Sequence, residues 1–331
     1  MSTSVSQSLS GLQVRAVSRP RLTRSQRREI WFFVFSAPFL FGLIALTLFP
    51  MGYGFYTSLT NWDGLSDLNT KFIGLQNYAQ ALKDPNVFPA VKQTLLFMAL
   101  NVPAWIIFSF ALALLLNRDL KGSGLLRTLF YLPTILPAVA VVMIWKIILD
   151  RNSGLLNGLL SLLRPGTAIP WLGQYALQGL VVTMVWGGLG WGMVVFLAGL
   201  QGIPAELIES AKIDGANSWH VFRNITLPLM SPVLFFQLVM ALIGSFQQLV
   251  YPLLMATPLG LGGETSVIGF TIPNGIRFFM VYTYERIRQS TYGYALALLW
   301  LLFVAIVALA ALLFWSEKFW VYKGDIEEQN A

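Results

Sequence analysis

Six long stretches of the chain contain no charged residue, and this pattern constrains the fold more than any other feature. They lie at residues 30–62, 93–117, 128–145, 165–205, 224–263 and 289–316. Since a helix needs about 20 mostly apolar residues to cross a bilayer core, each stretch is long enough for one span. We therefore predict an all-α, polytopic membrane protein with six transmembrane helices, near 31–58, 94–117, 128–149, 178–200, 229–257 and 293–315. The composition agrees, because 56% of the residues are hydrophobic and only 11% are charged.

Basic residues near the ends of the spans predict how the chain crosses the membrane. Six arginines between residues 15 and 28 precede the first span, and basic residues beside a span are retained in the cytoplasm. We therefore expect both termini to be cytoplasmic, together with the loops at 118–127 and 201–228. The predicted organisation is a disordered basic tail at 1–29, a transmembrane domain at 30–320 and a cytoplasmic tail at 321–331. A nucleic-acid or anionic-lipid patch is the weaker interpretation of the first tail, so no nucleic-acid partner is expected.

The sequence offers few groups for chemistry. It has no cysteine and one histidine, His220, which we expect to be a packed or solvated residue; no phosphate-binding loop occurs. The predicted span interiors contain no Asp or Glu, which disfavours an intramembrane enzyme and an ion-driven transporter. We expect Lys146 to reach outward from the third span and pair with Asp150. No cofactor, metal or catalytic residue is therefore predicted, and a partner would have to handle any nucleotide.

The loop at 201–228 carries helical patterning of its own. Pro204 can begin a helix that extends to Ile213, and Gly215 allows a turn that most other residues cannot adopt. Asn217 or Ser218 can then cap a second short helix, after which Pro228 restarts the chain into the fifth span. This helix–turn–helix hairpin is suited to docking another protein at the membrane surface. An amphipathic hairpin lying on lipid headgroups is the alternative.

The spacing of this loop resembles a known signature. Glu209-Ser210-Ala211 is followed by three residues, Gly215, nine residues and Ile225-Thr226-Leu227-Pro228. This is similar to the signature loop of ABC importer permeases, which usually has alanine at the position that Ser210 occupies here. The resemblance implies that the loop docks onto an ATPase subunit, through Glu206, Glu209, Ser210, Ala211, Gly215, Ile225, Leu227 and Pro228.

Other segments extend the resemblance over about residues 30–320. The segments 127–133, 154–157 and 72–78 are similar to the sugar-type permeases of maltose and glycerol-phosphate importers. The resemblance implies a type I ABC importer permease fold in a bacterial or archaeal cell membrane, surrounded by membrane lipid. It also implies a second permease subunit, two cytoplasmic ATPase subunits that bind ATP, and an external binding protein that delivers a carbohydrate substrate. A glycerol phosphate or polyol importer and a passive channel are the alternatives.

Polar and aromatic residues within the spans are candidates for the path of the solute. A sugar needs hydroxyl partners and flat apolar faces, which amides, hydroxyls and aromatic rings supply. The predicted set is Thr134, Trp186, Gly188, Trp191, Ser245, Gln247 and Gln248. Ser245 to Gln248 lie midway along the predicted fifth span, where maltose-type permeases carry asparagines. Each of these side chains could instead pack helices together, the role that we expect for Gln237 and Asn101.

Overall fold

The computed structural model describes residues 24–65, 70–118, 121–257 and 272–322. Within these residues the chain is helical apart from turns and one isolated bridge between Thr60 and Phe72, so the predicted all-α class is confirmed. Five helices are long and apolar enough to cross a membrane, and a bent helix pair raises the number to six. The chain divides into two units, residues 1–56 and 57–331.

The first unit contains one long apolar helical segment. It comprises α1 (Arg24–Leu43), a π-helical turn (Ile44–Leu48) and α2 (Phe49–Ser58), whose last two residues belong to the second unit. Phe49 N–H bonds to Ile44 O in the wider π register. Pro50 explains this register, because its ring would clash with the carbonyl four residues earlier in a regular α-helix. The segment Arg27–Ser58 matches the predicted first span.

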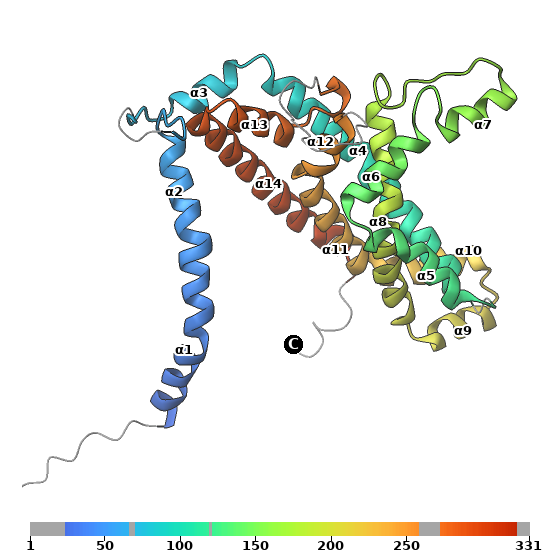
Figure 1. Ribbon diagram of the computed structural model, residues 1–331. Coiled ribbons are helices and arrows are strands. Elements are labelled where there is room, and N and C mark those ends of the chain that lie inside the picture. The colour runs from blue at the N-terminus through green and yellow to red at the C-terminus, as the bar shows by residue number, and fades with distance from the viewer. Residues whose placement is uncertain (1–23, 66–69, 119–120, 258–271, 323–331) are drawn as a thin grey trace, which may run out of the picture. The chain divides into compact units, whose positions relative to one another are not determined.

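The second unit is built around two helices that pack along each other, α4 (Val87–Leu116) and α8 (Ala176–Gln201). The final span, α14 (Tyr292–Trp320), packs beside α11 (Leu227–Phe246) (Figure 1). Buried Phe110, Phe196 and Met230 form part of the apolar core between α4, α8 and α11.

The third span differs from its prediction as one helix over 128–149. It consists of α5 (Ser123–Ile135) and α6 (Ala138–Ile148), bent by 100°. Leu136 and Pro137 are extended at the break, with ψ of 139° and 144°. Pro137 is the physical cause, because proline disfavours the helical conformation of the residue before it.

The fifth span differs from its prediction at both ends. The helix begins early, because α10 (Ser218–Val221), a π-helical turn (Phe222–Thr226) and α11 run on as 29 residues, Ser218–Phe246. Pro228 therefore does not restart the chain; like Pro50, it follows a π turn that makes room for its ring. The span then breaks at Gln247–Leu249 before α12 (Val250–Ala256). Pro252 accounts for this break, since it would clash with the carbonyl of Gln248 in a continuous helix.

Short helices gather at the two ends of the second unit (Figure 1). One end, the hairpin end, carries α9 (Ala205–Ile213) and α10, and α14 also finishes there, since Tyr322 N–H bonds to Ser231 Oγ at 2.8 Å. The opposite end carries α3 (Gln76–Lys83), α7 (Leu155–Leu163), a 3₁₀ turn (Asn274–Ile276) and α13 (Phe279–Arg288). The first 23 residues and the last nine, which include most of both predicted tails, lie outside the described residues.

Candidate functional site

The hairpin contains the predicted helix–turn–helix. Pro204 caps α9 rather than occupying its first position, and Glu206 lies in the first turn. Gly215 has φ of +85°, as the predicted turn requires. Its N–H bonds to Lys212 O at 3.1 Å and Ala216 N–H bonds to Ala211 O at 2.9 Å. This paired arrangement is the Schellman motif, which closes the C-terminus of a helix through a left-handed residue.

The second helix of the hairpin is capped by the side chain of Asn217. Its Oδ1 accepts from His220 N–H at 2.9 Å and contacts His220 Nδ1 at 3.0 Å. His220 is exposed, consistent with the solvated role predicted for it. Trp219 stacks on Phe222 at 5.6 Å, where α10 passes into the π turn. Ile225 lies in that turn, and Leu227 and Pro228 begin α11, so this half of the motif is part of the long helix.

The first helix of the hairpin has no buried residue within the structure. Glu206, Glu209 and Ser210 are exposed and Ala211 is half-buried. Ile213 is 86% exposed and Leu207 46% exposed, so the helix presents apolar side chains that this chain does not cover. An exposed helix with uncovered apolar side chains and acidic side chains beside them is chemically suited to contact with another protein, since such interfaces combine an apolar core with a polar rim.

The middle of α8 is a meeting point for both broken helices. Thr134 Oγ1, in the last turn of α5, donates to Gly187 O at 3.1 Å. A Cβ on Gly187 would stand 3.6 Å from Val141 Cγ1 of α6 and 3.7 Å from the Tyr251 hydroxyl of α12. The two breaks are therefore brought together around one glycine. The sequence gives no local signal for this convergence, although Pro137 and Pro252 mark where each helix breaks.

Neighbouring glycines allow the helices to approach closely. Trp105 Nε1 of α4 donates to Gly188 O at 2.9 Å. A Cβ on Gly190 would stand 2.6 Å from Phe130 O and from Tyr131 Cα, both backbone atoms of α5. Thr134 and Gly188, both predicted to face the solute, therefore also bond helices to one another.

The remaining predicted path residues lie around the same region. Trp186 packs edge-on against Trp145 with ring centres 5.9 Å apart, and Trp191 is 52% exposed. Ser245 is buried in the last turn of α11, Gln247 is exposed at the break, and Gln248 Nε2 donates to Gly244 O at 3.1 Å. The Ser245–Gln248 cluster thus lies at an interruption of the helix and not midway along a continuous span.

The predicted outward orientation of Lys146 is wrong. Its side chain is 1% exposed, and Nζ donates to the carbonyl and the hydroxyl of Thr257, just beyond α12. Asp150 instead accepts bonds from the backbone N–H groups of Asn152 and Ser153 and from the Ser153 hydroxyl, which lower its pKa. Because Thr257 provides both acceptors, Lys146 ties α6 to the end of α12. The predicted packing roles fit Gln237 and Asn101, which are both buried.

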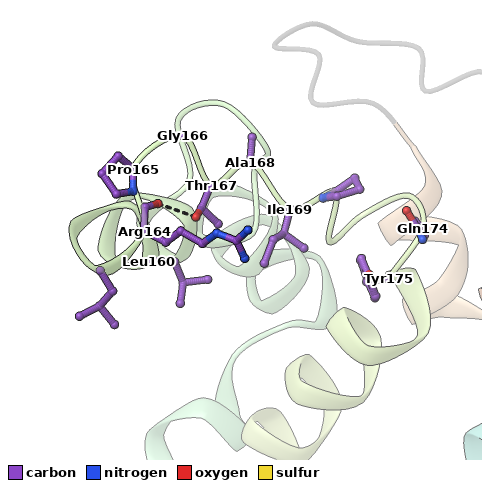
Figure 2. Close-up of a pocket in the computed structure, with 11 residues that line it drawn as sticks. Leu160, Arg164, Pro165, Gly166, Thr167, Ala168, Ile169, Gln174 and Tyr175 are labelled. Carbon is purple, nitrogen blue, oxygen red and sulfur yellow. Dashed lines mark hydrogen bonds between the residues drawn. The ribbon is translucent and has the colours of Figure 1, made fainter.

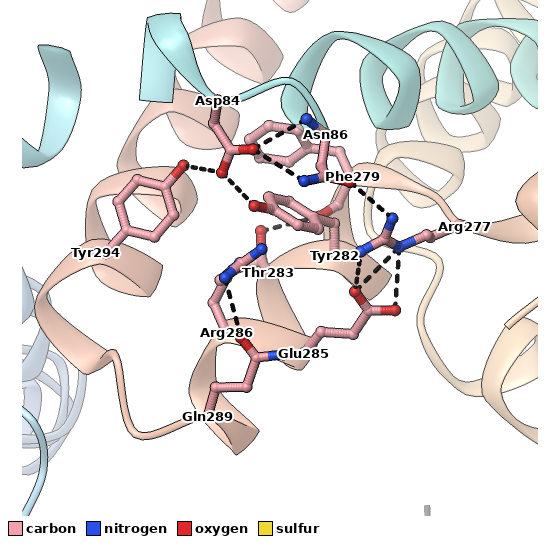
Figure 3. A network of polar contacts seen from close by, with 10 residues as sticks. All are labelled: Asp84, Asn86, Arg277, Phe279, Tyr282, Thr283, Glu285, Arg286, Gln289 and Tyr294. Atoms are coloured by element: carbon pink, nitrogen blue, oxygen red, sulfur yellow. Dashed lines mark hydrogen bonds and ion pairs between the residues drawn. The ribbon is translucent and has the colours of Figure 1, made fainter. Parts of the chain in front are cut away.

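A polar network joins α3, α4, α13 and α14 at the end opposite the hairpin (Figure 3). Asp84 accepts from the hydroxyls of Tyr282 and Tyr294 and from Asn86 N–H. Burial alone raises the pKa of Asp84, but these hydrogen bonds outweigh it and lower the pKa to about 2. Burial, together with the bond to Asp84, raises the pKa of Tyr282 to about 12.

An ion pair extends this network. Arg277 Nη2 lies 2.6 Å from Glu285 Oε2, and Arg277 Nη1 donates to Asn86 Oδ1 at 3.1 Å. The guanidinium groups of Arg277 and Arg286 lie 5.1 and 4.7 Å from the Tyr282 ring centre. The network fixes α13 against α4 and α14, and no single residue in the sequence signals it.

A hollow of about 630 Å³ lies at the same end, between α7 and the loop that follows it (Figure 2). Arg164, Thr167 and Tyr175 are among its lining residues. Asn157 holds the loop, since its Nδ2 donates to Ile169 O at 3.0 Å and its Oδ1 accepts from Trp171 Nε1 at 2.9 Å. The hollow is therefore a fixed feature of this surface.

Comparison with known proteins identifies the class of protein. Residues 105–319 match the family described as the inner membrane component of binding-protein-dependent transport systems. The chain belongs to this family, and the predicted resemblance to sugar-type ABC importer permeases is confirmed.

Individual relatives cover nearly the whole chain. It is 33% identical to a probable ABC transporter permease protein, YesP, of Bacillus subtilis, over 89% of this chain and 93% of that protein. It is 28% identical to the multiple sugar-binding transport system permease protein MsmF of Streptococcus mutans, over 86% of this chain and 93% of that protein. A chain of a bacterial alginate ABC transporter, solved in complex with an alginate pentasaccharide-bound periplasmic protein, superposes with a TM-score of 0.74 at 21% sequence identity. The superposition covers 90% of this chain and 97% of that chain. That likeness confirms the predicted fold.

Proposed function

We propose that the chain forms the transmembrane path for a carbohydrate in an ATP-driven importer, and that an external binding protein delivers the solute. The convergence of two broken helices on Gly187 carries this proposal. Interrupted helices leave backbone N–H and C=O groups without helical partners, and at membrane depth these are tolerated only inside protein or along a polar cavity. A path for a hydroxyl-rich solute makes use of such groups.

The side chains near the convergence favour a neutral, hydroxylated solute. Gln247 presents an exposed amide at one break, and Trp186 and Trp191 provide aromatic faces on α8. Ser245 and Gln248 supply a further hydroxyl and amide in our proposed path. A phosphorylated solute would need a free cation, whereas Lys146 is already bonded to Thr257. Relatives named for sugar transport support the same substrate class.

The hairpin is the proposed contact with one of two ATPase subunits, and a second permease subunit would complete the path. The continuous helix from Ser218 to Phe246 has 29 residues and a length of about 43 Å. It joins the hairpin directly to the break at Gln247, so movement of the hairpin would be transmitted to the proposed path without an intervening loop. In this arrangement the hairpin end and both termini are cytoplasmic, and the chain resides in a cell membrane.

Cysteine labelling tests the path, because the natural chain contains no cysteine. We expect a thiol introduced by Gln247→Cys to react with a small water-soluble reagent in the assembled complex, and the transported sugar to slow this reaction. Gln237→Cys is the matched control, since Gln237 is 1% exposed on the same helix and should stay unreactive. Equal reactivity at the two positions, or no effect of any transported sugar, would contradict the proposed path.

Disulfide crosslinking tests the hairpin. A cysteine at Ser210, on the exposed side of α9, should crosslink to cysteines placed along the surface groove of the ATPase subunit. A cysteine at Thr167, at the end of the second unit opposite the hairpin, should not crosslink to the ATPase subunit. Absence of crosslinks from Ser210 in an assembled, ATP-hydrolysing complex would argue against this docking face.

A further inference from the structure

A second cavity lies at the hairpin end, between the last turn of α4 and the hairpin. Its volume is about 650 Å³, and its lining includes Leu114, Arg118, Lys212, Asn217, Trp219 and Phe222. We propose that this cavity binds the headgroup of an anionic phospholipid. The proposal is independent of the solute path, because the cavity lies at the other end of α11 from the break at Gln247.

Two cations give the cavity its charge. Arg118 and Lys212 are both exposed, and neither side chain forms a hydrogen bond or an ion pair with another of the described residues. Among the described residues that line the cavity none is acidic. The negative end of the α4 dipole is already matched by a different residue, since Arg127 Nη2 donates to Leu116 O at 3.0 Å. Arg118 and Lys212 are therefore available to a phosphate group.

The apolar part of the lining distinguishes a phospholipid from free phosphate. Leu114 lies in the last turn of a membrane span, so the cavity sits at the depth where α4 leaves the hydrocarbon. Trp219 is 63% exposed, and its ring stacks on Phe222. Tryptophan favours this interfacial depth, and cations beside it attract anionic headgroups. The combination fits a molecule with a phosphate at one end and an acyl chain at the other.

The same geometry separates this cavity from the proposed ATPase contact. Leu207 and Ile213, the exposed large apolar residues of α9, do not line the cavity. A lipid could therefore occupy the space between α4 and the hairpin while α9 remains open to a protein. A bound headgroup would connect Arg118, just after α4, to Lys212 on α9, and would hold the hairpin against the end of α4.

Native mass spectrometry of the assembled complex tests the proposal, with phosphatidylglycerol and phosphatidylcholine as competing lipids. An anionic headgroup gains about fivefold in affinity from each nearby cation, so R118Q/K212Q should weaken phosphatidylglycerol binding by roughly 30-fold. The matched control is K121Q/R223Q, which removes two exposed cations of the same end that do not line the cavity. The charge-preserving variant R118K/K212R should bind phosphatidylglycerol like the natural chain, and recovery of R118Q/K212Q in the assembled complex would show that its loss of lipid does not reflect misfolding.

Three results would overturn the proposal. Equal loss of phosphatidylglycerol in the control variant would mean that only the general surface charge matters. Displacement of the bound lipid by millimolar inorganic phosphate would mean that the site recognises phosphate alone. Loss of the ATPase subunit from R118Q/K212Q, with phosphatidylglycerol binding unchanged, would mean that the cavity is a protein contact.

Discussion

Replacing Gly215 with alanine isolates the energetic cost of one backbone conformation in the hairpin. Gly215 has φ of +85°, and an added Cβ would meet no heavy atom within 4 Å. No contact is lost and no clash is created, so the whole cost is the strain of an L-residue in the left-handed region, about 1–2 kcal/mol. This energy shifts the balance between the closed turn and its open alternatives by roughly 5- to 30-fold.

Hydrogen exchange of the assembled complex measures this shift. In Gly215→Ala we expect the amides of residues 214–216, which bond back to α9, to exchange roughly 5- to 30-fold faster than in the natural chain. Exchange in the buried parts of α4 and α8 should not change. Gly215→Asn should exchange at an intermediate rate, because asparagine tolerates the left-handed region better than alanine.

Gly122 provides a matched control, since it has φ of +84° and also has no heavy atom within 4 Å of a built Cβ. Gly122→Ala introduces the same strain before α5 and should leave the hairpin amides unchanged. Exchange in Gly215→Ala at the rate of the natural chain, or an equal effect of Gly122→Ala on the hairpin amides, would show that strain at Gly215 does not control the turn. Under the proposed coupling, Gly215→Ala should also reduce transport more than it reduces assembly.

Three further predictions concern the packed part of the chain. Asp84→Asn should lower the thermal unfolding temperature at pH 7. Because the folded pKa of Asp84 is about 2, below the ordinary value of 3.8, the stabilising effect of this carboxylate should be complete above about pH 5 and disappear as the pH falls from 4 toward 2. Thermal unfolding of both proteins across this pH range measures the difference. Lys146→Met should unfold within a few degrees of the natural chain, because it replaces a buried cation by an apolar side chain of similar size, whereas Lys146→Glu should unfold at a much lower temperature. An equal fall of the unfolding temperature in both variants would contradict the burial of Lys146. Gly190→Ala should lower the free energy of unfolding by about 1–3 kcal/mol, since its Cβ would stand 2.6 Å from Phe130 O, while Gly244→Ala, with open space around the added Cβ, should not lower it. Equal unfolding temperatures for these two variants would disprove the close approach of α5 and α8.

The sequence predicted the spans well because their signal is local. A run of about 20 uncharged, mostly apolar residues is long enough to cross the bilayer wherever it packs, so the approximate positions of the spans followed from counting, whereas the breaks inside the third and fifth spans did not. The turn at Gly215 and the cap at Asn217 were predicted for the same reason, since each depends on its nearest neighbours in the chain.

Features that depend on distant segments were not predicted. Lys146 is bonded to Thr257, which lies 111 residues away, so its burial could not be read from the residues around it. The network around Asp84 joins residues separated by about 200 positions for the same reason. The helix breaks at Pro137 and Pro252 were local and could have been predicted from the effect of proline on the preceding turn. Their convergence on Gly187 required the packing of α8.

ATP hydrolysis by the complex, purified with its partner subunits in lipid nanodiscs, is the measurement that decides whether the chain serves the import of a neutral sugar. The measurement is made across a panel of neutral sugars, acidic sugars and glycerol phosphate, with and without the binding protein. We expect one neutral sugar to stimulate hydrolysis, and only when the binding protein is present. Stimulation by glycerol phosphate, or sugar flux through the chain without ATPase subunits, would contradict this expectation.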